Sequence, residues 1–222
     1  VLQRPPLPEE ITFLSLITVS SGRGGTKSKN VIKLKLPDKI RIETLGFMGH
    51  PAVLTTSDGT KVTVTLLTEQ RQYVGAADPE SIARIFGVAM PLRTITHIII
   101  GAPILETPGA VCEQENMLYR CRIATDNATA TLLINPDRRM LLHYDYVSER
   151  IPARYAVSYA EFKKAAGRML PHRVVISNPD TGKTVTIRHL AVSNEPITDA
   201  AFQQQTFPGA AFFPLEALQE LW

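Results

Sequence analysis

Two glycine-containing segments of the sequence carry residues of the kind that bind phosphate. The first, GRGGTKS (residues 22–28), has Thr26 between its last glycine and its lysine, so the Gly-Lys-Ser/Thr order of a phosphate-binding loop is broken. It also lies between two expected strands, so no helix N-terminus follows it. The second, GKT (residues 182–184), lacks the glycine that should stand five residues earlier. Neither segment is expected to bind a nucleotide.

Histidine, serine and acidic residues show no catalytic or metal-binding spacing. The sequence contains no GxSxG nucleophile motif and no HExxH metal motif. The five histidines are dispersed, and we interpret each as a surface residue or a hydrogen-bonded core residue: His50, His97, His143, His172 and His189. A histidine could still meet a serine and an acid in the folded chain. We expect no enzyme activity, no metal and no cofactor.

The two cysteines, Cys112 and Cys121, form no CxxC motif and have no neighbouring pair of histidines, which argues against a metal site. Their spacing fits two positions that face each other across a hairpin. A disulfide is one reading, suited to an oxidising compartment. Two free thiols that pack as small apolar side chains are the other.

Length and charge narrow the class of protein. A chain of 222 residues can bury a substantial core, and its net charge of +3 is spread without a basic stripe. Nucleic acid is therefore not expected as a partner, although a weak preference for anionic surfaces is compatible with the charge. No apolar run approaches the roughly 20 residues that a membrane-spanning helix needs. The chain begins at Val1 rather than Met, so we expect that a preceding segment was removed.

Most of the chain has the alternation of apolar and polar residues that is typical of β-strands. Residues 1–10, with three prolines, are expected to form a leader or tether, followed by a single domain over 11–222. Residues 21–30 are expected to form a glycine-rich loop, and 158–167 either a short helix or an irregular strand. The tail is compatible with a helix over 215–222. Strands are expected over 11–20, 31–36, 39–45, 51–56, 61–67, 118–124, 128–135, 140–147, 173–178 and 183–193.

Two short helices are expected in the middle of the chain. Asp78 is a good N-cap, Pro79 suits the first helical position, and Gly87 can end this helix. Pro91 opens the second helix, and residues 101–103 close it. The fold class is mainly β (α+β), a curved antiparallel half-barrel closed by short helices.

One apolar set of residues is expected to face the interior. It is either an ordinary core or the lining of an apolar cavity, and these readings are compatible. Its members are Ile40, Ile42, Val62, Val64, Ile82, Ile85, Phe86, Ile95, Ile98 and Ile99.

Phe47 and Met48 stand between Gly46 and Gly49 at an expected hairpin tip, an unusual place for two large apolar residues. We interpret them as a contact with a membrane or an apolar cargo. The alternative is that the tip folds back into the core or packs against the C-terminal tail. Residues Arg23, Lys27 and Lys29 are read as a solvated loop, with contact to anionic headgroups as the alternative.

Residues 38–103 resemble the LolA/LolB-like lipoprotein carrier and receptor superfamily, most of all the outer-membrane lipoprotein receptor LolB. The resemblance is carried by the strand 39–43, the tip ending at Gly49, the Asp58-Gly59 hairpin, Tyr73, the helix start 78–80, and residues 86–88, 90–92 and 99–103. In the second half, Tyr159, residues 170–171 and 194–197, and Phe202 look like the closing strands of the same superfamily.

The resemblance implies an eleven-stranded half-barrel with an apolar cavity for lipoprotein acyl chains. It implies a bacterial envelope protein at the periplasmic face of the outer membrane, anchored by an N-terminal lipid absent from this chain. Its partners would be acyl chains, the membrane surface and a periplasmic carrier protein, and it would insert lipoproteins into the outer membrane. The Phe-Met pair replaces the exposed loop leucine of the family, and the chain extends past the expected end. The alternative function is a non-carrier envelope scaffold or assembly lipoprotein whose own side chains fill the cavity, since fold does not fix function.

Overall fold

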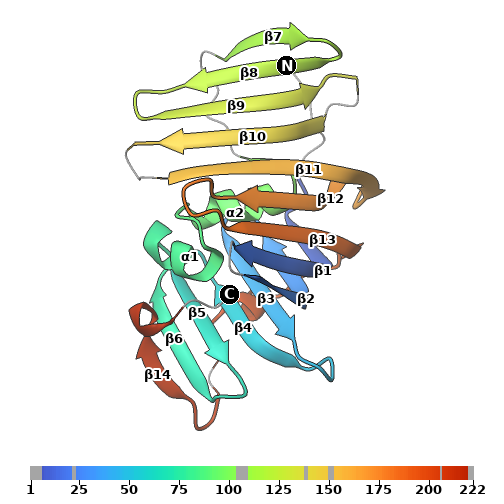
Figure 1. Cartoon of the computed structure of the whole chain (residues 1–222). Helices are drawn as coiled ribbons and strands as arrows, with labels where there is room; N and C mark the ends of the chain where they lie inside the picture. The colour runs from blue at the N-terminus through green and yellow to red at the C-terminus, as the bar shows by residue number, and fades with distance from the viewer. Residues whose placement is uncertain are drawn as a thin grey trace.

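A single large, curved and open β-sheet with two short helices forms the protein (Figure 1). The computed structural model describes residues 7–21, 24–103, 110–137, 140–149, 153–205 and 207–219. The fourteen strands lie in the order β14-β6-β5-β4-β3-β2-β1-β13-β12-β11-β10-β9-β8-β7. All neighbours are antiparallel except β14, which runs parallel to β6. The strand bounds are β1 Glu10–Ser21, β2 Gly24–Lys35, β3 Lys39–Leu45, β4 Pro51–Ser57, β5 Lys61–Leu66, β6 Arg71–Ala76, β7 Val111–Glu115, β8 Leu118–Ala124, β9 Ala128–Asn135, β10 Met140–Ser148, β11 Ala153–Ala165, β12 Arg168–Ser177, β13 Thr184–Ser193 and β14 Ala211–Pro214.

The sheet consists of two meanders joined at one seam. Strands β1 to β6 each pair with the next strand in sequence, and so do β7 to β13. The seam is the pairing of β1 with β13, in register from Thr12 with Ser193 to Ser20 with Thr184. The first and last strands of the two meanders therefore meet in the middle of the sheet.

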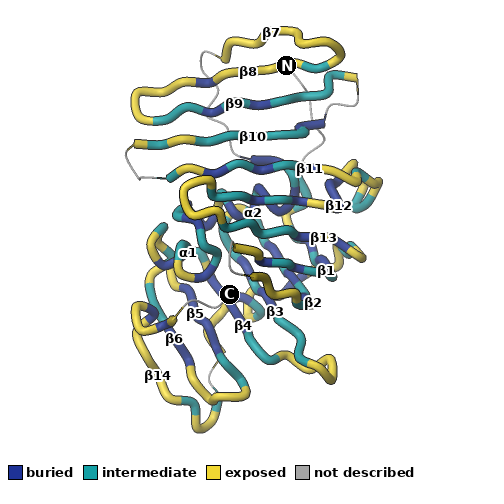
Figure 2. Tube along the Cα trace, viewed as in Figure 1, coloured by how far each residue is buried: buried dark blue, intermediate teal, exposed yellow. Residues whose placement is uncertain are grey.

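Period-two alternation decides which strand residues are buried, because successive side chains point to opposite faces. In β1 the pattern alternates along ten residues, with Ile11 and Phe13 almost completely buried. In β3, Ile40 and Ile42 are buried as expected. Figure 2 shows that the buried positions gather on the central strands, whereas β7 is exposed along its length. The core therefore lies between the centre of the sheet and the helices.

The two helices begin and end where their local sequence signals predict. Helix α1 (Pro79–Phe86) starts after Asp78, whose carboxylate accepts a 2.8 Å hydrogen bond from the Ser81 backbone N–H, and it ends at Gly87 with φ of 77°. Helix α2 (Leu92–Ile99) follows Pro91. Both helices are amphipathic and bury their isoleucines, among them Ile82 and Ile98. Strands β7–β10 extend beyond them in Figure 1.

One sequence-based expectation for local structure is wrong, and one pair of alternatives is decided. The glycine-rich loop expected over 21–30 is wrong, because β2 begins at Gly24 and pairs along the end of β1, with Thr26 opposite Val19. This part of β2 is polar and exposed on both sides, so no apolar alternation marks it. For residues 158–167 the strand reading is correct, since most of them belong to β11.

The strand count also differs from the eleven that the resemblance implied. Strands β7 and β14 at the two edges were not expected from the sequence. β14 is followed by a 3₁₀ turn, Leu215–Ala217, rather than the helix considered for the tail, and residues 220–222 lie outside the described part. Leu215 is completely buried and packs with Val64 and Tyr73. The C-terminal segment thus covers the β6 end of the sheet.

Candidate ligand-binding cavity

A half-open cavity of about 440 Å³ lies between the segment that links the helices and strands β8–β11. On one side, residues 89–91 and the first turn of α2 form its wall. On the other side, Ile123 and Ala130 come from β8 and β9, and tyrosines come from β10 and β11. Its volume falls within the several hundred cubic ångströms typical of small-molecule sites. Its volume is larger than that of the other two cavities described among these residues, which are about 10 and 40 Å³.

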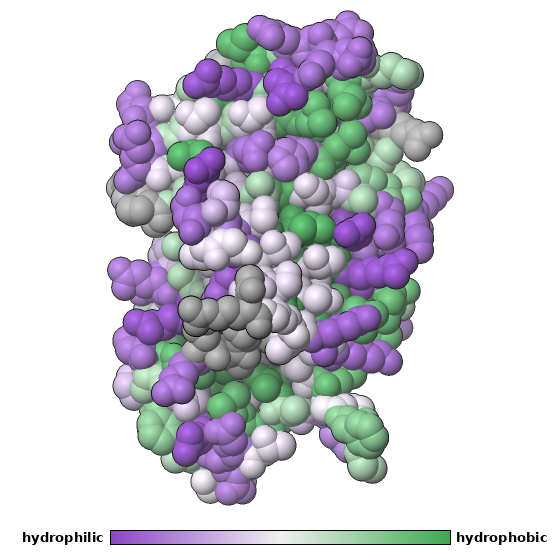
Figure 3. Space-filling view, viewed as in Figure 1, coloured by the Kyte–Doolittle hydropathy of each residue, from purple (hydrophilic) through white to green (hydrophobic). Residues whose placement is uncertain are grey.

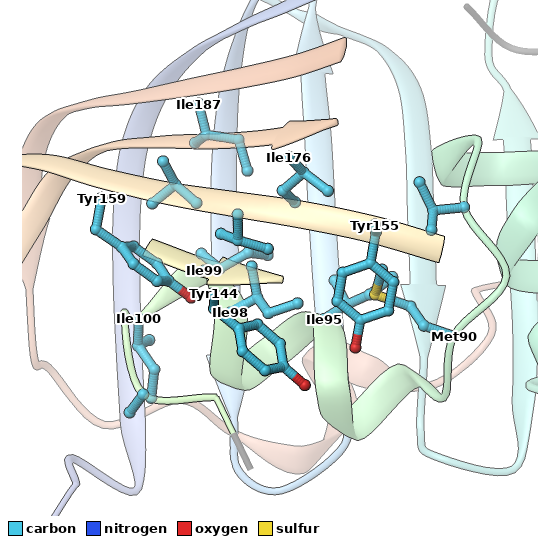
Figure 4. Close-up of a cluster of buried hydrophobic side chains, with 14 of the residues drawn as sticks. Met90, Ile95, Ile98, Ile99, Ile100, Tyr144, Tyr155, Tyr159, Ile176 and Ile187 are labelled. Carbon is cyan, nitrogen blue, oxygen red and sulfur yellow. The ribbon is translucent and has the colours of Figure 1, made fainter. Parts of the chain in front are cut away.

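Three tyrosines form the strand wall. Tyr146 and Tyr155 stack with ring centroids 5.0 Å apart, and Tyr144 meets Tyr155 edge to face at 5.9 Å. The hydroxyls of Tyr144 and Tyr155 each influence the pKa of the other. Figure 4 shows both hydroxyls directed to the same side of the cluster. The wall therefore offers apolar ring faces with a small polar group between them.

Burial further favours the neutral form of two tyrosines in this wall. Desolvation raises the pKa of Tyr144 to about 12, and it also raises the pKa of Tyr155 well above the usual value. Tyr144 and Tyr155 expose only 2% and 3% of their surface. Both hydroxyls therefore stay protonated at neutral pH, where they can donate to a carbonyl, hydroxyl or carboxylate oxygen of a ligand.

Part of the remaining lining is polar. It includes Arg93 and Thr94 in the first turn of α2, Thr125 to Asn127 in the turn after β8, and Ser148 at the end of β10. Arg93 is exposed and forms no ion pair with any described residue. The cavity combines apolar and polar parts, as an amphiphilic ligand requires.

The cavity-lining residues expected from the sequence lie elsewhere. Five of them line a second, apolar cavity of only about 40 Å³ between the helices and the sheet: Ile42, Ile85, Phe86, Ile95 and Ile99. Ile40, Ile82 and Ile98 belong to the same core cluster without bordering this space. Val62 and Val64 pack in a separate cluster with Leu215. None of the ten residues borders the large cavity. The compartment between the helices and the sheet, where the small cavity lies, is nearly filled by side chains.

Phe47 and Met48 project from the molecule at the tip of the β3–β4 hairpin. The Gly49 N–H donates to the Gly46 carbonyl at 3.0 Å, so the two apolar residues occupy the central positions of a β-turn. Phe47 is fully exposed, and Met48 is 80% exposed. This tip extends from the lower right of the body in Figures 1 and 3, where it is largely green. The alternative that the tip folds back into the core is therefore wrong for this structure. Lys27 and Lys29 are exposed on neighbouring β2, whereas Arg23 lies outside the described residues.

Cys112 and Cys121 are joined by a disulfide across the β7–β8 hairpin, where they are directly opposite each other. The sequence left open whether the two cysteines form a disulfide or remain free thiols, and the structure contains the disulfide. It attaches the edge strand β7, which is exposed at all five positions, to the rest of the sheet.

Two serine–histidine pairs form that the sequence could not reveal. His143 contacts Ser158 at 2.9 Å and Asp145 at 3.0 Å, with all three on one half-exposed sheet face that borders none of the cavities described above. Ser15 and His189 are hydrogen-bonded at 2.8 Å within the core. The second nitrogen of His189 contacts the Ile99 carbonyl rather than an acid. Neither pair has the open cleft that a nucleophile needs to reach a substrate.

The described part of the chain contains neither a cluster of metal ligands nor a membrane-spanning helix. Among the described residues no three His, Cys, Asp or Glu side chains lie close enough to bind a metal ion together. In the same part of the chain, no helix has the length and apolar character needed to cross a bilayer.

The tyrosine wall and Met90 are the functional candidates that sequence reasoning missed. A signal was present, because Tyr144 and Tyr146, two residues apart, share one face of a strand, and Tyr155 and Tyr159 do so on the next. The sequence predicts residues 140–147 only as a strand, and residues 158–167 only as a short helix or an irregular strand. Nothing in the sequence around Met90 indicates that this residue faces the tyrosine wall across the cavity.

Comparison with known proteins supports the fold. No protein-family model matches the sequence, and no curated protein matches it either. Among solved structures, a LolA superfamily protein from Nitrosomonas europaea aligns over 89% of this chain and 91% of its own, with a TM-score of 0.61 and 9% identity. A DUF1329 family protein from Desulfovibrio piger aligns over 88% and 90%, with a TM-score of 0.62 and 12% identity.

A third neighbour comes from Vibrio parahaemolyticus and is described as an outer membrane lipoprotein-sorting protein domain. It aligns over 87% of this chain and 88% of its own, with a TM-score of 0.54 and 11% identity. Identities this low establish shared architecture and leave function to be argued from the site. The resemblance found in the sequence is thus supported by three-dimensional structure: this chain has the LolA/LolB-like fold.

Proposed function

We propose that this protein is a non-catalytic lipid- or lipoprotein-binding protein of the bacterial cell envelope. In this proposal an acyl chain enters the cavity between the interhelix segment and strands β8–β11. The observation that carries the proposal is the 440 Å³ cavity itself, with tyrosine rings on one wall and Arg93 and Thr94 on another. Burial of each methylene group contributes about 0.8 kcal/mol, so a chain of ten or so carbons suffices for tight binding.

Location and partners follow from the same proposal. The Phe47-Met48 tip would enter the apolar edge of a bilayer, which supports action at a membrane surface. The disulfide suits the oxidising periplasm. Delivery of lipoproteins to the outer membrane, receipt from a periplasmic carrier and an N-terminal lipid anchor remain predictions from the resemblance.

A scaffold or assembly role is the second candidate, and one observation favours it. The compartment between the helices and the sheet, where the fold resemblance implies an acyl-chain site, retains only about 40 Å³. In this second candidate function, the protein's own side chains occupy the space between the helices and the sheet. The adjacent large cavity is the reason that we place lipid binding first.

Filling the cavity tests the two candidates. In Ala130→Phe the new ring enters the cavity, because Ala130 lines it, and we expect at least about tenfold weaker binding of a fatty-acid probe to the delipidated protein. Thr131→Phe is the matched control, since Thr131 is next on the same strand and points to the opposite face. Native mass spectrometry with organic extraction would identify any lipid that copurifies. An unmodified protein mass, with no uptake of fatty acid or lipidated peptide, would favour the scaffold.

A further inference from the structure

Met90 stands between the two cavities. It lines the open, tyrosine-walled cavity and also the small apolar cavity behind it, and among the described residues it is the one common to both walls. Its side chain is 2% exposed. Figure 4 shows Met90 on the same side of the buried cluster as Tyr155 and near the α2 residue Ile95. The two spaces thus meet at one flexible side chain.

The backbone around Met90 holds it in this place. The segment between the helices begins at Gly87, in the left-handed conformation that ends α1, and finishes at Pro91, which precedes the first turn of α2. Val88 and Met90 are buried on this short segment, and Leu92 follows at the start of α2. The main chain is fixed at both ends, whereas an unbranched methionine side chain has several rotatable bonds and can adapt to its neighbours.

Volumes give the size of ligand that each space admits. A small heavy-atom group occupies about 30 Å³, the share of a water molecule in the liquid, so 440 Å³ holds about fifteen such groups. The space behind Met90 holds about one more. The lining behind is apolar throughout apart from Thr55, with Ile95, Ile99 and Ile187 among its members.

We propose, building on the lipid-binding function above, that Met90 forms the inner end of the ligand cavity and sets the longest single acyl chain that it admits. The ligand would be a single-chain amphiphile, with its polar end at Arg93 and its methyl end against Met90. Replacing Met90 with a small residue removes the Cγ, Sδ and Cε atoms and joins the two cavities. The joined space admits about four more carbons than the original cavity.

The test measures chain-length preference. The delipidated protein is titrated with saturated fatty acids of about ten to about twenty carbons, each buried methylene being expected to tighten binding about fourfold. For the unaltered protein we expect the affinity to increase with the length of the fatty acid up to about fifteen carbons and to stay constant for longer fatty acids. Met90→Ala should extend the rise by about four carbons. Met90→Leu, which keeps the volume, should leave the limit unchanged.

A second variant keeps the proposal testable if Met90→Ala does not fold. Met90→Phe adds a larger side chain beside open space, so it should shorten the preferred chain by about three carbons. Identical chain-length limits in the unaltered, Ala and Phe proteins would overturn the role of Met90 while leaving lipid binding intact. Failure of the unaltered protein to take up any chain would instead overturn the proposed function, and this inference with it.

Discussion

The exposed tip gives the most direct prediction, because it separates membrane contact from folding. We consider the double substitution Phe47→Ser and Met48→Ser. Both side chains stand free in solvent at the centre of a turn closed by backbone hydrogen bonds, so their loss removes no core contact. Transfer of each side chain from water into an apolar layer is worth about 1.5 to 3 kcal/mol. With both at the low end, the double variant should bind vesicles about a hundredfold more weakly.

The assay is flotation with vesicles of mixed zwitterionic and anionic phospholipids, alongside thermal unfolding. We expect the unfolding midpoint to stay within the error of measurement. A matched control replaces two other exposed apolar residues, Met169 and Leu190 on β12 and β13, with serine. Equal flotation of the tip variant and the unaltered protein would refute membrane contact by the tip. An equal loss of vesicle binding in the tip variant and the control variant would show that any exposed apolar residue contributes to binding, wherever it lies on the surface.

Three further predictions concern the framework around the site. Burial lowers the pKa of His189 to about 4, so the folded chain binds a proton at this residue less readily than the unfolded chain. The free energy of unfolding should therefore fall by up to roughly 3 kcal/mol as the pH drops from about 6.5 to about 4. Urea unfolding at several pH values measures this change. His189→Gln should reduce that pH dependence, and an unchanged slope would contradict the assignment. Asp78→Ala removes the N-cap bond of α1 and should cost about 1 kcal/mol in thermal unfolding, whereas Asp78→Asn should cost less. A Cβ at Gly75 would lie 2.7 Å from the Leu215 Cβ, so Gly75→Ala should expose the C-terminal segment to limited proteolysis. Adding Leu215→Gly, which removes that Cβ, to Gly75→Ala should relieve the clash, and a purely additive loss of stability would argue against it.

Local signals in the sequence were sufficient for the helices and for most strands. Asp78, Pro79 and Gly87 act within one or two turns of backbone, so the bounds of α1 could be predicted without knowledge of its surroundings. Strand β7 could not, because every side chain in it is exposed and its place in the sheet comes from backbone pairing and the Cys112–Cys121 bridge. The polar half of β2 was missed for the same physical reason.

The candidate site was harder to predict than the fold. An apolar stripe on a helix looks alike in sequence whether it lines an open cavity or a filled one, and here the space beside Ile95 and Ile99 is nearly filled. The large cavity depends on how far β8–β11 curve away from residues 89–91, which is a property of the whole sheet. Side-chain types at single positions carry no information about that distance.

The seam between β1 and β13 has a consequence for how the chain acquires its structure. The two strands are separated by most of the sequence, from Thr12 to Ser193, yet their ladder holds the two meanders together. Closing so long a loop before any seam contact forms is entropically costly, and folds with such distant pairings fold slowly. During synthesis the β1 edge of the first meander would stay open until β13, and so almost the whole chain, has emerged. Exposed strand edges promote aggregation, so a molecular chaperone that protects them would raise the yield of folded protein.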